Sequence, residues 1–397
     1  MVMVKDLTQL TLKDLWREVK DEEDWWGDIN ERVLDMVKLI LESSLEEELL
    51  EELQVSRYRR SKLRRGYRNG YYPRDLYTMF GVIKSLRVPR ARERYDSRIL
   101  PHYQRRQEEI NRMVRDMFLA GVSTRRVGEV LTKIKGENVS AQTVSRIASS
   151  LDAEVDRFHG KQLTDDYRYL FLDGICLKVK GANTVHKRHV LCAYGITWGG
   201  KKEIISFRQA SSESEAQWEA FLRNLYKRGL EGKQLCLIVT DGCPGLHGAL
   251  ETVYPYIARQ RCWAHKLRNV ANKILKRDID ECMAGARLIY LAGHRREAVK
   301  CFRDWESRWG ILYPRAINCL GKDLDELLNF FDMPSDHWIK VRTTNVIERS
   351  FREVRRRIRP MSCFTNSRSV DRIIYGVINH LNESWEEIPF IKFTQNN

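Results

Sequence analysis

Three acidic residues stand where predicted secondary structure could bring their carboxylates together. Asp173 lies inside the apolar run LFLDGICLK, and Asp241 ends a second apolar run, CLIVTDG. A carboxylate among core-type residues is costly to bury unless it is paired or bound to a metal. Glu348 lies in the basic segment TTNVIERSF, which has a helical pattern, and would fall in the first turn of that helix.

Three carboxylates at one point repel one another unless a cation lies between them. Ligand sets made of oxygen atoms suit Mg²⁺ or Mn²⁺, and two such ions can stabilise the attacking and leaving oxygens of phosphoryl transfer. We therefore predict that Asp173, Asp241 and Glu348 are catalytic and bind two Mg²⁺ ions, with Mn²⁺ as a substitute.

Structural interpretations of the same acids stay open. Asp173 and Asp241 each precede a glycine, and Asp-Gly pairs often only shape turns. Glu348 stands three residues after Asn345, a spacing that also suits a helix-capping residue. Asp332 and Asp336 are competing candidates for the third acid.

A histidine and two cysteines lie near these acids in the sequence. Cys262-x-x-His265 and Cys243-x-x-x-His247 could form a zinc site, although their spacing suits zinc poorly. We instead predict that His265 contributes to catalysis by contacting DNA near the acids; a buried structural histidine is the alternative.

The charge of the chain favours a polyanionic partner. Its 397 residues carry a formal net charge of +15, and residues 57–106 contain sixteen Lys or Arg against three acids, with tyrosines interleaved. A β-element that grips DNA phosphates is the functional interpretation of this segment, and a solvated basic loop is the alternative. The candidate phosphate contacts are Arg64, Arg65 and Arg68.

Two helical regions add further candidate DNA contacts. Residues 108–157 show three short amphipathic helices with glycine turns, which suit a helix-turn-helix or a plain three-helix bundle. Ser123 or Thr124 is the predicted cap of the second helix, and Ser140 is the predicted cap of the third. Arg349, Arg352 and Arg356 share a helix face, which predicts a phosphate track, with a solvated basic face as the alternative. The predicted DNA contacts in these regions are Arg125, Arg126, Gln142, Thr143, Arg146, Arg349, Arg352 and Arg356.

The elements that must position the acids predict an α/β fold with an RNase H-like mixed sheet. Three strands at 169–179, 188–197 and 201–208 form a meander, followed by a helix, a strand at 235–240, a helix and a strand at 258–263. A flavodoxin-like sheet fits less well because helices do not separate the first three strands. In such a sheet the first and fourth strands are neighbours, so Asp173 and Asp241 would meet.

The same patterns divide the chain into segments. An acidic amphipathic helix lies in residues 1–56 and would pack on its own domain or form a dimer contact. The remaining segments are a basic DNA-contacting region at 57–107, a helix-turn-helix domain at 108–160, the catalytic core at 165–268 and 337–390, and an α-helical insertion at 269–336.

The chain resembles the Mutator-type transposases of bacterial insertion sequences over nearly its whole length. The similar blocks are RRGYRNGYYPRD (64–75), LRVPRAR (86–92), LPHYQRR (100–106), GVSTRRVGEVL (121–131), VSAQTVSRI (139–147), LFLDGICLKVK (170–180), VTDGCPGLHGAL (239–250), QRCWAHKLRNV (260–270) and TTNVIERSFREVRRR (343–357). One departure is Cys176, where an aromatic residue such as Tyr is expected.

The resemblance implies a DDE-type transposase with a helical insertion before its last acid. It implies that the catalytic acids fall on Asp173, Asp241 and Glu348 and the family's C-x-x-H signature on Cys262 and His265. The implied reaction is Mg²⁺-dependent cleavage at the terminal inverted repeats of its own element, then 3′-OH attack on target DNA. A homodimer or higher homo-oligomer on paired ends is the implied assembly.

Two other functions stay open, and the composition adds expectations about location. A helix-turn-helix regulator would bind DNA without cutting it, and an RNase H-like nuclease or junction resolvase would cut without joining strands. All nine cysteines lie after residue 175, which does not suggest a disulfide framework. With no apolar run of about 18 residues, we expect no membrane association and a bacterial cytoplasmic protein associated with the nucleoid.

Overall fold

The computed structural model describes residues 25–56, 58–59, 62–93, 95–135, 139–180, 184–358 and 366–386. These residues form two compact units. The first comprises the described residues up to Phe118 together with Val122–Ala148, and the second comprises Leu119–Gly121 and the described residues from Ser149 onward.

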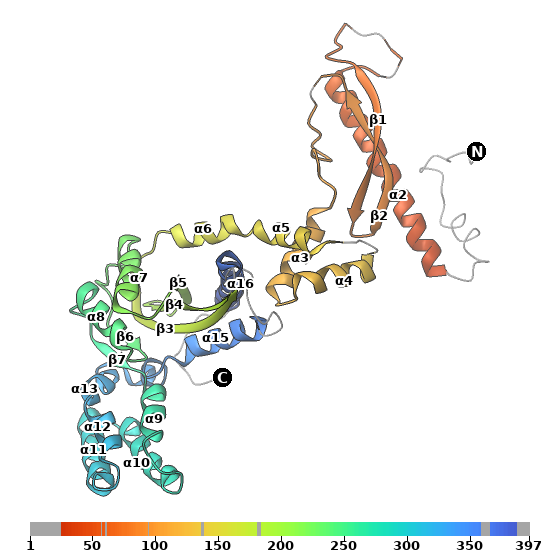
Figure 1. The fold of residues 1–397 in the computed structure, drawn as a ribbon. Helices are drawn as coiled ribbons and strands as arrows, with labels where there is room; N and C mark the ends of the chain where they lie inside the picture. The colour runs from red at the N-terminus through yellow and green to blue at the C-terminus, as the bar shows by residue number, and fades with distance from the viewer. Residues whose placement is uncertain are drawn as a thin grey trace. The chain divides into compact units, whose positions relative to one another are not determined.

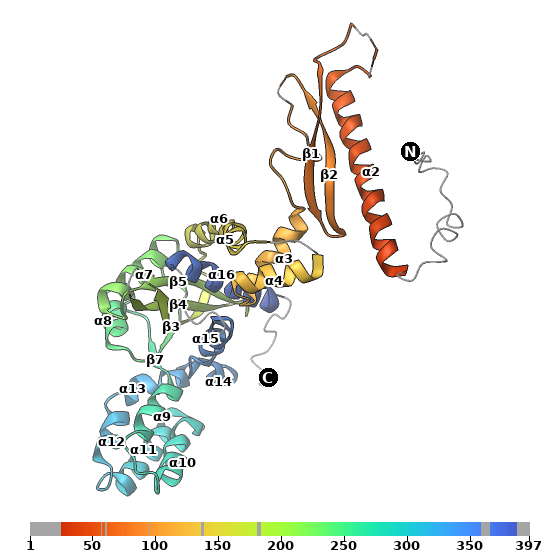
Figure 2. The same cartoon turned by 45° about the vertical axis from the view of Figure 1, so that its right-hand side comes forward.

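In the first unit a long helix packs along a two-stranded hairpin. Helix α2 (Trp25–Leu53) lies beside the antiparallel strands β1 (Arg68–Thr78) and β2 (Gly81–Ala91) (Figure 2). Leu45 and Leu49 of α2 are wholly buried, as is Leu86 of β2. The predicted basic β-element is thus confirmed as a hairpin, and α2 uses its leucine face within its own unit.

The buried carboxylate of Glu48 in α2 accepts hydrogen bonds from the segment that follows the hairpin. Glu48 accepts hydrogen bonds from Tyr95 Oη at 2.7 Å, from the Arg98 N–H at 2.6 Å and from the Ser97 hydroxyl. Burial acts to raise the pKa of Glu48, but the bonds from Ser97, Tyr95 and Arg98 outweigh it and hold the pKa below its usual value. The ionised carboxylate therefore stabilises the folded unit.

Three short helices complete the first unit. Helices α3 (Glu108–Leu119), α4 (Thr124–Lys135) and α5 (Ala141–Ser149) bury apolar residues together, among them Ile110, Val127 and Val144. Both predicted caps are confirmed, because Ser123 Oγ accepts the Arg126 N–H at 3.4 Å and Ser140 Oγ accepts the Thr143 N–H at 3.2 Å. Part of the turn between α4 and α5, residues 136–138, lies outside the described residues.

The second unit is built on a five-stranded mixed sheet of order β5-β4-β3-β6-β7. Strands β3 (Tyr167–Lys180), β4 (Val185–Thr197) and β5 (Lys202–Ala210) pair antiparallel, whereas β6 (Leu237–Thr240) and β7 (Arg259–Arg261) add in parallel beside β3. The predicted strand order is confirmed, including the neighbouring position of the first and fourth strands.

Helices cover both faces of this sheet. On one face, α7 (Glu215–Lys227) and α8 (Pro244–Val253) pack on the alternate residues Leu170, Leu172 and Leu191. On the other, α15 (Asn345–Ile358) and α16 (Ser367–Glu386) pack on Ile175 and Val190, and α6 (Asp152–Gly160) contacts α16 and β5 (Figure 1). The helix predicted between the third and fourth strands is confirmed as α7, which begins after Ser214.

A helical segment separates β7 from α15 (Figure 1). Its helices are α9 (Trp263–Ala271), α10 (Ile279–Leu291), α11 (Arg295–Trp309), α12 (Pro314–Gly321), α13 (Leu324–Leu327) and α14 (Trp338–Val341), with 3₁₀ turns at Asn329–Asp332 and Ser335–His337. As predicted, residues 269–336, all of them described, contain no strand. In the parts of the chain that the structure describes, no helix combines the length and apolarity needed to cross a membrane.

We predict that Glu48→Ala will destabilise the full chain by about 2–3 kcal/mol, because the half-buried Tyr95 and Ser97 side chains and the Arg98 N–H lose a buried, charged acceptor. Since folding lowers the pKa of Glu48, its contribution is present above the unfolded carboxyl pKa and is lost as the pH falls through the folded value. Urea unfolding at pH 7 measures the loss. Glu51→Ala, on the exposed face of the same helix, should change stability by less than about 0.5 kcal/mol, and equal effects would contradict the prediction.

Candidate active site

Asp173 and Asp241 lie side by side on paired strands. Leu172 of β3 is in register with Thr240 of β6, so each aspartate is the next residue along its strand. Asp173 is buried, with its Oδ1 accepting the Gly174 N–H at 2.7 Å. Asp241 Oδ1 accepts the Cys243 N–H at 2.9 Å, so this aspartate also shapes the turn that follows β6.

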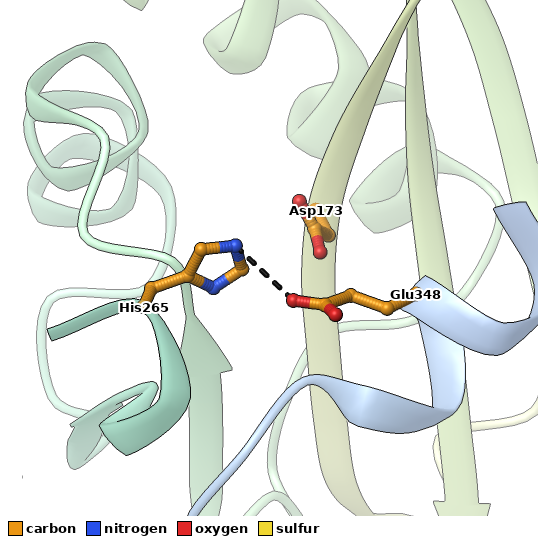
Figure 3. Close-up of side chains that lie close together, drawn as sticks. All are labelled: Asp173, His265 and Glu348. Atoms are coloured by element: carbon orange, nitrogen blue, oxygen red, sulfur yellow. Dashed lines mark ion pairs between the residues drawn. The ribbon is translucent and has the colours of Figure 1, made fainter. Parts of the chain in front are cut away.

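Glu348 and His265 reach the same place from two helices. Glu348 lies in the first turn of α15, and His265 lies in α9, which follows β7. His265 Nε2 is 3.2 Å from Glu348 Oε1, and the ligand atoms of Asp173, His265 and Glu348 all lie within 4.8 Å of one another (Figure 3). The structure therefore brings Asp173, Glu348 and His265 together, with Asp241 beside Asp173 but outside that group.

Burial and like charge dominate the electrostatics of these acids. Burial raises the pKa of Asp173 to about 7, and the charges of Asp241 and Glu348 act in the same direction. The pKa of Asp241 is also raised, first by burial. The pKa of His265 is raised to about 9, first by the adjacent Cys262 side chain and then by Asp173 and Glu348, although burial opposes the rise. The raised pKa favours the protonated imidazolium form of His265, whose positive charge partly offsets the negative charge of the carboxylates.

Two buried polar atoms at this site have no hydrogen-bond partner among the described residues. They are Glu348 Oε1 and His265 Nδ1. Glu348 Oε1 faces His265 Nε2 at ion-pair distance without hydrogen-bond geometry. A buried carboxylate oxygen that is not satisfied by the protein is an available ligand for a cation.

The alternative candidates for the third acid and for zinc have other partners. Asp332 pairs with Arg295 at 3.3 Å, and Asp336 lies 3.7 Å from His337. His247 Nε2 is 3.0 Å from Glu326, while Cys243 Sγ contacts the Glu213 carbonyl oxygen. Within the described ranges, the group of side chains arranged to hold a metal is Asp173, His265 and Glu348.

Sequence reasoning missed two polar residues near the acids. Glu213 adds negative charge that raises the pKa of Asp241, and its Oε1 lies 3.0 Å from His189 Nδ1. Thr344 is wholly buried, and its N–H and hydroxyl both point to Cys262 Sγ. Neither residue has a spacing signal, although a threonine directly before a predicted helix is a usual capping position.

The predicted DNA contacts of the first unit differ in their availability. Arg64, Arg65, Arg125, Arg126, Gln142 and Arg146 are exposed, and Arg126 lies 3.8 Å from Glu129. Arg68 instead pairs with Glu46 at 2.6 Å, and the Thr143 hydroxyl lies 3.0 Å from the Ser140 hydroxyl at the start of α5. A DNA contact by Arg68 or Thr143 would have to compete with these intramolecular bonds.

One arginine of the predicted phosphate track on α15 also pairs with a neighbouring acid. Arg349 and Arg352 are exposed and make no ion pair with the residues that the structure describes. Arg356 pairs with Glu353 at 3.0 Å. Arg349 and Arg352 are thus available to contact phosphates.

Comparisons with known proteins match nearly the whole chain and all indicate the same family. A family model described as "Transposase, Mutator family" matches residues 8–388. The chain is 32% identical to the transposase for insertion sequence element ISRM5 of Rhizobium meliloti, over 89% of this chain and 88% of the relative. It is 30% identical to the transposase for insertion sequence element IS256 in transposon Tn4001 of Staphylococcus aureus, over 90% and 91% of the two chains.

The position of Asp241 gives a direct prediction. Asp241→Asn should lower the pKa of Asp173 below its value of about 7, because it removes the largest like charge acting on that carboxyl. Carboxyl ¹³C NMR titration of the metal-free chain measures the shift. Asp332→Asn removes a carboxylate that pairs elsewhere and should leave the pKa unchanged. An unchanged pKa of Asp173 in the Asp241→Asn variant would mean that the two carboxylates do not interact.

Proposed function

Since the chain belongs to the Mutator family of transposases, we propose that it is a DNA transposase with Asp173, Asp241 and Glu348 as its catalytic acids. It cleaves at the terminal inverted repeats of its own insertion sequence and then joins the freed 3′-OH to target DNA. The observation that carries this proposal is the convergence of Asp173, His265 and Glu348 within 4.8 Å, next to Asp241 on the paired strand.

The strand order supports an RNase H-like catalytic core. An antiparallel meander whose first strand pairs in parallel with the fourth, which pairs in parallel with the fifth, is the arrangement expected of that fold. Helices on both faces bury the sheet, and Asp173 lies in the middle of β3 beside the end of β6, where Asp241 follows. The core would comprise residues 165–268 and 337–390.

The helical segment at 269–336 has the features of an insertion into that core. The Trp263 N–H donates to the Arg342 carbonyl oxygen at 3.0 Å, so the chain leaves the sheet and returns to it at nearly one point. A segment whose ends meet can be added without moving the elements that flank it. This closure lets α15 follow β7 in space despite the long sequence between them.

The residues of the site fit divalent cations. Asp173, Asp241 and Glu348 offer oxygen ligands of the kind that Mg²⁺ and Mn²⁺ prefer, and Glu348 Oε1 is buried without a hydrogen-bond partner among the described residues. When bound, two Mg²⁺ ions would polarise the scissile phosphate and stabilise both the attacking and leaving oxygens. Added positive charge would also favour ionised Asp173, whose pKa is otherwise raised to about 7.

The chain's own side chains position the reacting groups. Asp173 and Asp241 are fixed by paired strands, whereas Glu348 is fixed by the start of α15. His265 contacts Glu348 at 3.2 Å, and its raised pKa lets it hold a proton beside a phosphate oxygen of the DNA. Preorganised charge of this kind lowers the barrier to phosphoryl transfer because little rearrangement is needed.

The basic surfaces would hold the DNA on which this site acts. The hairpin segment at 57–107 and the helix-turn-helix at 108–160 would bind the terminal repeats, and Arg349 and Arg352 would guide phosphates toward Glu348. The acidic segment at 1–56 would support the first unit, and a homodimer or higher homo-oligomer would pair the two ends. Contacts to phosphates position the DNA, whereas contacts to base edges, with Gln142 and Arg146 as candidates, specify the sequence.

Asp173→Asn, Asp241→Asn and Glu348→Gln should each abolish strand cleavage and leave binding of the terminal repeats within about threefold, because the basic surfaces are unchanged. A gel assay with labelled repeat ends and Mg²⁺ measures both steps. Asp332→Asn is the matched control and should cleave normally. Cleavage retained in any one of the three variants would remove that residue from the catalytic set.

The same assay separates this function from the two alternatives. Joining of the 3′ end to a second DNA would exclude a resolvase or simple nuclease, which cuts without joining. A regulator would bind the repeats and leave them intact at every metal concentration. Cleavage without any joined product would overturn the transposase proposal and favour the nuclease.

Arg352→Ala should weaken end binding several-fold and make the salt dependence shallower by about one phosphate contact. Arg356→Ala should have a smaller effect, because Arg356 already pairs with Glu353. Fluorescence anisotropy across a salt series measures both quantities. Equal salt slopes for Arg352→Ala and the unaltered chain would contradict the phosphate track.

A further inference from the structure

Cys262 connects the segments that carry Asp241, His265 and Glu348. Its N–H donates to the Thr240 carbonyl oxygen at 2.7 Å, directly before Asp241. Its side chain is buried, and Sγ accepts the Thr344 N–H at 3.3 Å and the Thr344 hydroxyl at 3.4 Å. Cys262 also stands at the start of α9, which carries His265 one turn later.

Thr344 is linked to Glu348 by a backbone hydrogen bond. The Thr344 carbonyl oxygen accepts the Glu348 N–H at 3.2 Å, so the two residues form the first turn that leads into α15. Thr344 is wholly buried and cannot replace Cys262 with water as a partner. Any displacement of Thr344 therefore moves the backbone of Glu348 relative to Asp173 and Asp241.

We infer that Cys262 is a positioning residue that fixes Glu348 at the metal site, with Sγ as the shared acceptor for both Thr344 donors. This inference rests on the proposed metal site but concerns how that site is held together. The thiol binds no metal in this scheme and does not touch the DNA. Its role is to hold the start of α15 against the end of β6, between two of the acids.

The chemistry of sulfur suits this position. A thiol sulfur is a large, weak acceptor that can take two donors at 3.3–3.4 Å. Cys262→Ala would leave the buried Thr344 N–H and hydroxyl without an acceptor, so the first turn of α15 would shift to satisfy them. Cys262→Ser keeps an acceptor, although its oxygen lies closer to the Cα than sulfur does, and should restore part of the contact.

The test compares full-length Cys262→Ala, Cys262→Ser and Thr344→Val with the matched control Cys282→Ala. Cys282 is another buried cysteine, but it lies in α10 of the helical segment. Two readouts are needed: Mn²⁺ affinity by titration, and amide hydrogen exchange at residues 344–348 in the metal-free chain. Thermal unfolding checks that each variant is folded.

Cys262→Ala should bind Mn²⁺ about 10- to 100-fold more weakly, the range seen when a partner of a metal ligand is lost, and should exchange faster at 344–348. Thr344→Val should weaken binding in the same direction, Cys262→Ser should fall between, and Cys282→Ala should match the unaltered chain. The Cys262→Ala/Thr344→Val double variant should bind Mn²⁺ no more weakly than Cys262→Ala alone, because Cys262→Ala already removes the hydroxyl contact that Thr344→Val removes.

Unchanged Mn²⁺ affinity and unchanged exchange in Cys262→Ala and Thr344→Val would overturn the inference. If the unaltered chain binds no Mn²⁺, the proposed metal site fails instead, and the exchange rates still decide whether Cys262 fixes the start of α15. An equal loss in Cys282→Ala would show general destabilisation and also overturn the positioning role.

Discussion

Repulsion between carboxylates that are buried together is the constraint on which the second unit depends. Desolvation and neighbouring negative charge raise the pKa of Asp173 to about 7, so ionising all the acids at once is unfavourable in the folded chain. Because the carboxylates repel one another, they stay close together only if the surrounding structure fixes the backbone at each acid. The paired strands β3 and β6 do this for Asp173 and Asp241, and the buried Thr344 does it for Glu348.

The same constraint explains why a histidine lies among the acids. His265 is protonated at neutral pH because Cys262, Asp173 and Glu348 raise its pKa to about 9. Its charge partly offsets the carboxylates in the metal-free chain. Divalent cations at this place would take over that role, so the contact between His265 and Glu348 would weaken as the cation contacts form. His265 would then be available to the DNA.

The sequence allowed the sheet order and the candidate acids to be predicted because both depend on local pattern. The apolar runs that surround Asp173 and precede Asp241 mark strands whatever their surroundings, and these strands are neighbours as expected. Side-chain partners depend on the tertiary fold and could not be predicted. The pairing of Arg68 with Glu46 and the approach of His265 to Glu348 have no signature in spacing.

The low acid content of residues 57–106 has a physical consequence for the arginines there. Arg64, Arg87 and Arg90 lie over the rings of Tyr67, Tyr71 and Tyr72 at 4.9, 4.6 and 4.4 Å. A ring face orients a guanidinium group without neutralising it, so the N–H edge stays able to donate to phosphate. Glu46 does the opposite to Arg68, because an ion pair uses both the charge and the donors. Interleaved tyrosines thus order a basic surface at little cost to its attraction for DNA, which acids at the same positions would remove.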